Sequence, residues 1–194
     1  MERAATVVRK TKETNIELTL GLDGGEVVVD TGVGFFDHML TALAVHGGFG
    51  LRLKAEGGWN VDCHHTVEDT GIVLGRAFKQ ALGDRSGIVR YGHAMIPMDE
   101  ALGFASIDIS GRPYLVFNAE FTTDSVGGFD TEMVKEFFHA ITYAVGMNLH
   151  IKMLESGNNH HMIEGIFKAF AKALDQATLT DSRINDVLST KGTL

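Results

Sequence analysis

A pattern that occurs twice constrains the fold of this chain more than any other feature. His64-His65-Thr66-Val67-Glu68 in the first half is matched by His160-His161-Met162-Ile163-Glu164 in the second half. Strand-like residues 51–54 and 149–152 precede the two copies and align with each other. A pattern that recurs together with its surroundings indicates internal duplication. The sequence therefore predicts two similar halves.

The spacing of apolar residues predicts the same order of elements in each half. The expected elements are strands at 16–20 and 26–29, a helix near 36–45 and a strand at 51–54, then strands at 103–109 and 114–121, a helix near 132–145, a strand at 149–152 and a helix from about 160 to 178. Residues 83–87 are the best candidate junction. We expect an α/β fold in a single domain over residues 1–194, with halves of about 1–86 and 87–194.

Composition excludes several classes of function. A formal net charge of -8 without a basic run argues against a nucleic-acid binder. No apolar run approaches the roughly 18 residues that span a membrane, and residues 1–6 lead into charged positions rather than an export signal. The single cysteine, Cys63, suits a reducing compartment. We expect a cytoplasmic protein.

The repeated pattern has the residue types and spacing of a metal site. On a helix, residues four apart differ by about 40° in direction, whereas adjacent residues diverge by about 100°. Two adjacent histidines are therefore better placed to serve two ions than to chelate one. His38 and Glu136 add a further matched pair, because each lies thirteen residues before its aligned strand. Mixed imidazole and carboxylate ligands favour Mn, Fe, Co, Ni or Zn over Ca or Mg, and the carboxylates favour manganese.

Structural roles are the alternative for these histidines. One His-His pair alone could simply begin a helix on the surface, but two pairs with Glu at the same spacing favour ligation. His38 lies in an apolar run, where a histidine is often a core residue. We assign His46, His93, His139 and His150 to structural roles or to contacts with the ligands.

Several further motifs carry a family resemblance. They are Phe36-Asp37-His38-Met39-Leu40, Pro97-Met98-Asp99-Glu100-Ala101-Leu102, Ser110-Gly111-Arg112-Pro113-Tyr114 and Phe167-Lys168-Ala169-Phe170. With the two His-His-x-x-Glu copies, they closely resemble the monofunctional form of imidazoleglycerol-phosphate dehydratase over nearly the whole chain. The resemblance implies a duplicated α/β sandwich, ribosomal protein S5 domain 2-like, in which each half is a mixed β-sheet packed against two helices.

The resemblance also implies a metal cofactor and an assembly. Two Mn²⁺ ions per active site would be held by ligands from neighbouring subunits of a cubic-symmetry homo-oligomer of 24 chains. The implied ligands are His38, His64, His65, Glu68, Glu136, His160, His161 and Glu164. Many family members carry His at the position of Glu136, where the carboxylate is also a competent ligand. Cys63 and Leu188 replace an acidic residue and a proline that are common in the family.

The implied substrate is a small phosphorylated imidazole diol. Arg90 and Arg112 match phosphate-binding positions, where a guanidinium supplies charge-assisted, paired contacts. Further substrate contacts are implied for Glu13, His38, Lys168, Ser189, Thr190 and Lys191. Without the resemblance, these basic residues would be interpreted as solvated surface charges, and Glu13 would as readily be an exposed strand residue.

We hypothesise that the reaction uses the substrate imidazole as its electron sink, because the proton removed lies next to no carbonyl. Metal ions on both ring nitrogens would favour the imidazolate. Loss of the hydroxyl would give a diazafulvene-like intermediate, and proton loss with tautomerisation would give imidazole acetol phosphate. Glu13 is the first candidate for proton transfer and Glu164 the second, with His38 also in the catalytic set.

Two other functions fit part of the pattern. A dinuclear metal hydrolase would use similar ligands to activate water, and phosphate release from simple esters would support it. A non-catalytic metal-binding or RNA-associated module would share the α/β fold. The acidic composition and the absence of basic repeats argue against the RNA-associated module.

Overall fold

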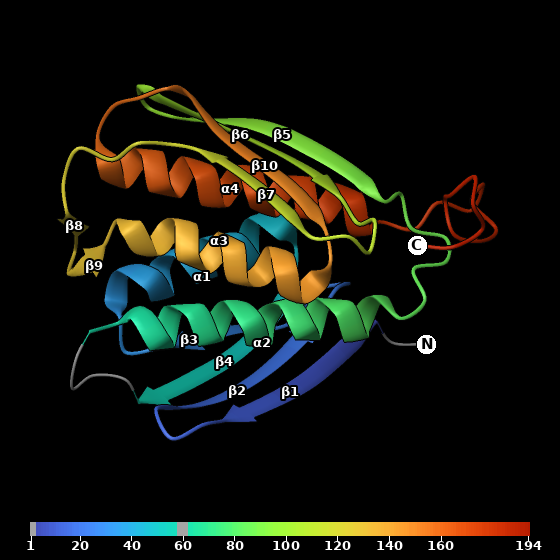
Figure 1. Cartoon of the computed structure of the whole chain (residues 1–194), viewed down its shortest axis with the longest axis horizontal. Helices are drawn as coiled ribbons and strands as arrows, with labels where there is room; N and C mark the ends of the chain where they lie inside the picture. The colour runs from blue at the N-terminus through green and yellow to red at the C-terminus, as the bar shows by residue number, and fades with distance from the viewer. Residues whose placement is uncertain (1–2, 58–61) are drawn as a thin grey trace.

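In the computed structural model, which describes residues 3–57 and 62–194, two four-stranded sheets form the outer layers and four long helices lie between them (Figure 1). Helices α1 (Gly34–Gly47) and α2 (His64–Leu82) pack on one sheet, and α3 (Glu132–Val145) and α4 (Asn159–Thr178) pack on the other. The two helix layers meet through α2 against α3 and α1 against α4. The sequence predicts no export signal at residues 1–6. Residues 1 and 2 of that segment lie outside the described residues.

The two halves have the same order of elements, except that the second half has two additional short strands before its first helix. The first half has β1 (Ala4–Lys10), β2 (Thr14–Gly21), β3 (Val27–Asp30), α1 (Gly34–Gly47), β4 (Gly50–Gly57) and α2 (His64–Leu82). The second half has β5 (Tyr91–Met98), β6 (Ala101–Asp108), β7 (Tyr114–Asn118), the short β8 (Ser125–Val126) and β9 (Phe129–Asp130), α3 (Glu132–Val145), β10 (Asn148–Glu155) and α4 (Asn159–Thr178).

The two sheets also have the same topology. Their strand orders are β1-β2-β4-β3 and β5-β6-β10-β7, and in each sheet the last pair is parallel while the others are antiparallel. The prediction of duplicated halves, each a mixed sheet packed on two helices, is therefore confirmed. The candidate junction at 83–87 connects α2 to β5, and the boundary at about residue 86 stays a prediction.

The sequence did not reveal the outer strands of the two hairpins, β1 and β5. Both are edge strands with few buried residues: only Val7 is buried in β1 and only Gly92 in β5. The apolar alternation that predicts a strand is correspondingly weak. β2 shows the opposite case, because Ile16, Leu18 and Leu20 alternate cleanly into the core. β7 ends at Asn118, three residues before the predicted end at 121.

Two glycines on α2 set the distance between the helix layers. A Cβ atom at Gly71 would lie 3.0 Å from the carbonyl oxygen of Phe137, and one at Gly75 would lie 2.5 Å from the Cβ of Ala144. The missing side chains let α3 approach α2 closely. This approach brings the segment of α3 that carries Glu136 to the first turns of α2. Among the described helices, none is long and apolar enough to cross a membrane.

Candidate metal centre

The start of α4 presents two of the predicted ligands on one face. The Oδ1 atom of Asn158 accepts a hydrogen bond of 2.9 Å from the backbone N–H of His160, which caps the helix. His160 and Glu164 then lie one turn apart, with 3.2 Å between His160 Nε2 and Glu164 Oε2. The motif thus points an imidazole and a carboxylate at the same space.

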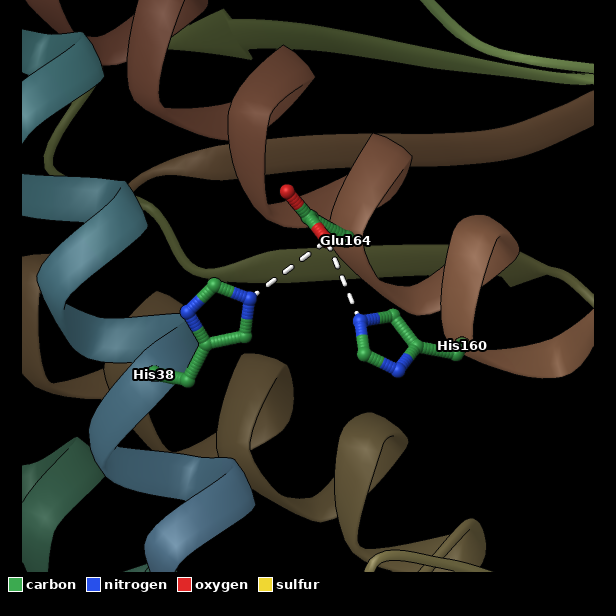
Figure 2. Close-up of side chains that lie close together, drawn as sticks. All are labelled: His38, His160 and Glu164. Carbon is green, nitrogen blue, oxygen red and sulfur yellow. Dashed lines mark hydrogen bonds and ion pairs between the residues drawn. The ribbon is translucent and has the colours of Figure 1, made fainter.

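His38 of α1 completes this group from the other half of the chain. Its Nε2 atom lies 3.5 Å from the same Oε2 atom of Glu164. Figure 2 shows His38 and His160 both pointing toward Glu164. The His38 side chain is 51% exposed, so it is not a core residue, which was the alternative interpretation. The ring of Phe35 packs edge-on against both imidazoles. The ligand atoms of His38, His160 and Glu164 all lie within 4.8 Å of one another.

Lys168 controls the charge of Glu164. Burial of Glu164 raises the pKa of its carboxyl, but the hydrogen bond and charge of Lys168, followed by those of His38, bring that pKa below its ordinary value. Lys168 Nζ binds Oε1 of Glu164 at 2.7 Å, which leaves Oε2 facing the histidines. The ionised carboxylate of Glu164 keeps one oxygen free of Lys168, and this oxygen together with the two imidazole nitrogens forms a competent set of metal ligands.

The outer histidine of the same pair has partners of its own. His161 Nδ1 lies 3.0 Å from Glu100 Oε2, and His161 Nε2 lies 3.7 Å from Asp99 Oδ2. Hydrogen bonds from the backbone N–H groups of Asn158 and Glu100, followed by one from His161, lower the pKa of Glu100 to about 2. Asp99 and Glu100 have no site role among the sequence predictions, and the one signal for them is their motif at residues 97–102, which contributes to the family resemblance.

The first half presents a looser version of this arrangement at the start of α2. His64 Nε2 lies 4.0 Å from Glu68 Oε2, and His65 Nδ1 lies 3.6 Å from Glu13 Oε2. Glu136 is half-buried on α3. Within residues 3–57 and 62–194, the two groups of three or more convergent ligand atoms are His38 with His160 and Glu164, and Asp99 with Glu100 and His161. Glu136, His64, His65 and Glu68 belong to neither group.

A separate cavity contains most of the predicted phosphate contacts. It has a volume of about 910 Å³, and its lining includes Arg90, Arg112, Ser189, Thr190 and Lys191. The guanidinium of Arg90 is already held, because it donates to both carboxylate oxygens of Asp108 at 2.6 and 3.1 Å and to the carbonyl oxygen of Leu188 at 2.6 Å. The cavity therefore gathers four cationic side chains, including Arg183, beside the C-terminal segment.

This cavity lies at the opposite end of α4 from the candidate metal ligands. The backbone N–H of Arg90 donates to the carbonyl oxygen of Ala177, in the last turn of α4, whereas His160 lies in its first turn. At 1.5 Å per residue these points are about 26 Å apart. Figure 1 shows α2 and α4 beginning at one end of the molecule and the C-terminus at the other. Lys168 lies with Glu164, not in the cavity.

Residues 31–174, which contain both His-His-x-x-Glu copies, match the family model of imidazoleglycerol-phosphate dehydratase. This chain belongs to the imidazoleglycerol-phosphate dehydratase family. Imidazoleglycerol-phosphate dehydratases of Lachnoclostridium phytofermentans and Acetivibrio thermocellus are 58% and 54% identical to it, each over the full length of both chains. These full-length matches include the segments that carry Glu13 and residues 189–191.

Solved imidazoleglycerol-phosphate dehydratase structures share the fold. The enzyme from Staphylococcus aureus superposes with a TM-score of 0.85 at 42% identity and covers 92% of this chain and 99% of its own. The enzyme from Pyrococcus furiosus gives a TM-score of 0.85 at 37% identity and covers 97% of this chain and 100% of its own. As an imidazoleglycerol-phosphate dehydratase, the chain is a hydro-lyase of histidine biosynthesis that acts on a small-molecule substrate. The family match favours this function over the hydrolase and the non-catalytic module.

Proposed function

We propose that this dehydratase is Mn²⁺-dependent and converts D-erythro-imidazoleglycerol phosphate to imidazole acetol phosphate and water. The observation that carries the proposal is the convergence of His38, His160 and Glu164, which come from two halves of the chain. Ligands of one transition-metal ion lie about 2.0–2.2 Å from it, and therefore about 3–4.4 Å from one another. The separations of 3.2 and 3.5 Å to Glu164 Oε2 fit that range.

The full ligand set that we propose serves two ions per active site. It consists of His38, His64, His65, Glu68, Glu136, His160, His161 and Glu164. The chemistry of this set supports the choice of metal, because mixed nitrogen and carboxylate ligands suit manganese better than calcium or magnesium. When bound, the metal ions supply Lewis acidity that stabilises negative charge on the substrate imidazole.

The residues of the chain supply proton transfer. The dehydration removes a proton from one carbon and a hydroxyl group from its neighbour, and the enol that forms becomes the ketone by tautomerisation. Glu13 is the proposed base, because its carboxylate is 59% exposed and lies next to His65 without being a close partner of it. Glu164 is less suited, since Lys168 and the imidazoles already engage both of its oxygens.

The cavity beside the C-terminus is the proposed phosphate site. Arg112, Lys191 and the hydroxyls of Ser189 and Thr190 offer charge and hydrogen-bond donors to a phosphate dianion. Arg90 is fixed by Asp108, so its remaining N–H groups are oriented before the substrate arrives. A guanidinium that is held in place loses little freedom on binding, which favours affinity.

The distance between the two sites supports a shared active site. A small imidazole phosphate cannot bridge about 26 Å along α4. We therefore propose that the ligands of one chain meet the phosphate site of another in a cubic-symmetry homo-oligomer of 24 subunits. We further propose a cytoplasmic location and no nucleic-acid or membrane partner. Lys168 would contact the substrate from the metal side of this shared site.

The test is turnover of imidazoleglycerol phosphate to imidazole acetol phosphate by metal-stripped protein, with and without added Mn²⁺. We expect ketone formation to be absent without metal and restored by Mn²⁺, with Mg²⁺ as the matched control ion that fails to restore it. Full activity of the metal-stripped protein, or restoration by Mg²⁺ alone, would refute the manganese dependence.

A further inference from the structure

Glu13 and Glu100 occupy equivalent positions in the two halves. Glu13 immediately precedes β2, the second strand of the β1–β2 hairpin, and Glu100 immediately precedes β6, the second strand of the β5–β6 hairpin. These strands lie next to β4 and β10 respectively, in sheets of the same order. Each carboxylate also faces the Nδ1 atom of the outer histidine of its half, His65 or His161. In each half, the duplication has therefore placed a carboxylate next to the Nδ1 atom of the second histidine of the pair.

The two carboxylates nevertheless differ in how they are held. Glu100 Oε1 accepts a hydrogen bond of 2.6 Å from the backbone N–H of Asn158, the N-cap of α4, and Glu100 Oε2 lies 3.0 Å from His161 Nδ1. In the part of the chain that the structure describes, the Glu13 carboxylate accepts no hydrogen bond, and its distance of 3.6 Å to His65 Nδ1 is too long for one.

A glycine provides the space for the Glu100 carboxylate. A Cβ atom at Gly157 would lie 2.2 Å from Glu100 Oε1 and 2.6 Å from its Cδ. Any side chain at position 157 would therefore displace the carboxylate from the Asn158 N–H. The backbone of Gly157 does not adopt a positive φ, so alanine is compatible with it.

We propose that Glu100 is a positioning residue that fixes the ring and tautomer of His161 for metal binding, while its counterpart Glu13 is left free to transfer protons. An imidazole that donates its Nδ1 proton to a carboxylate presents the Nε2 lone pair to an ion, and the carboxylate makes that nitrogen a stronger ligand. The inference rests on the proposed role of His161 as a metal ligand.

The experiment measures Mn²⁺ affinity of the metal-stripped, full-length protein by isothermal titration calorimetry. Glu100→Gln keeps the shape of the side chain and removes its charge, whereas Gly157→Ala keeps the charge and displaces the carboxylate. We expect each to weaken Mn²⁺ binding by about tenfold, the lower end of the effect typical of residues that orient metal ligands. Glu13→Gln, the matched change in the first half, should stay within about twofold of wild type.

A double-mutant cycle separates positioning from general damage to the fold. If Gly157→Ala acts through Glu100, it should weaken binding no further in the Glu100→Ala background. The unfolding temperature of each metal-free variant should stay close to wild type, so that lost affinity cannot be ascribed to unfolding. Additive effects of the two changes would overturn the proposal.

His161→Ala distinguishes the two ways of failing. If His161→Ala weakens Mn²⁺ binding but Glu100→Gln and Gly157→Ala do not, the positioning role is wrong and the proposed function stands. If His161→Ala itself binds Mn²⁺ as wild type does, His161 is not a ligand and that part of the proposed function fails.

Discussion

Lys168 Nζ lies 2.7 Å from Glu164 Oε1, one turn away on α4, while the other oxygen of Glu164 faces His38 and His160. The two oxygens of one buried carboxylate are thus divided between a fixed cation and the candidate metal site. The pair keeps Glu164 ionised despite its burial, and it does so without occupying the oxygen that faces the imidazoles.

Replacing Lys168 by Met should destabilise the metal-free protein in a pH-dependent way. The pKa of Glu164 lies below its unfolded value, so the stabilisation from its ionised form is present above the ordinary glutamate pKa and is lost as the pH falls through the folded value. We expect a loss of about 1–3 kcal/mol near pH 7 that shrinks below about pH 4.5. Denaturant unfolding between pH 4 and pH 7 measures it.

Lys172→Met is the control for this prediction, because Lys172 pairs with Asp175 on the exposed side of the same helix. An exposed pair contributes little, so its removal should change stability by less than about 1 kcal/mol. A loss from Lys168→Met that is equal at pH 4 and pH 7 would show that packing, and not the charge of Glu164, accounts for it.

Glu136 should tolerate replacement by His better than by Gln. A histidine on the same face of α3 keeps a metal-binding atom, whereas a neutral amide is a weaker ligand. We expect Glu136→Gln to weaken Mn²⁺ binding by about tenfold and Glu136→His to keep it near wild type. Calorimetric titration checks both, with Glu132→Gln, one turn earlier and exposed, as the unaffected control. Equal affinities for all three variants would remove Glu136 from the ligands.

Replacing Glu13 by Gln should leave bound manganese unchanged and lower turnover by about 100-fold or more, because a proton-transfer group is lost while the ligands remain. Steady-state kinetics and metal analysis of the same sample measure the two effects. Glu17→Gln, on the exposed face of β2, is the matched control. Wild-type turnover by Glu13→Gln would exclude Glu13 from the mechanism.

Arg112→Met should lower kcat/KM by about 10- to 100-fold, because a charge-assisted contact to phosphate contributes about 1.5–3 kcal/mol. Arg183 lines the same cavity, but its side chain is 87% exposed and paired with Asp181. Arg183→Met should therefore change kcat/KM by less than about threefold. If Arg183 proves the more sensitive of the two, the phosphate site is misassigned.

Mixing two impaired variants should raise activity above that of either one if the sites are shared between chains. His160→Ala damages the metal side and Arg112→Met the phosphate side, about 26 Å apart in one chain. Co-assembled subunits would form some active sites from the undamaged side of each partner. Turnover of the mixture, refolded or coexpressed, should exceed that of either variant. A mixture no more active than its components would place both sides in one chain.

The sequence alone determined the elements whose patterns are local. The helices near 36–45, 132–145 and 160–178 and the inner strands were predictable because burial leaves a regular spacing of apolar residues along each of them. The repeated His-His-x-x-Glu pattern predicted candidate metal ligands at both helix starts, since a helix fixes which of its residues share a face.

Only the tertiary structure decided how distant segments meet. Edge strands β1 and β5 bury too little to leave a pattern, yet their hairpins carry Glu13 and Glu100 to the histidine pairs. Sixty-one residues separate Glu100 from His161, and strand pairing brings their side chains to 3.0 Å. Arg90 immediately precedes β5, and β5 begins beside the last turn of α4. This placement separates Arg90 from His160, which lies in the first turn of α4. Such contacts depend on packing between elements, which the periodicity within an element does not encode.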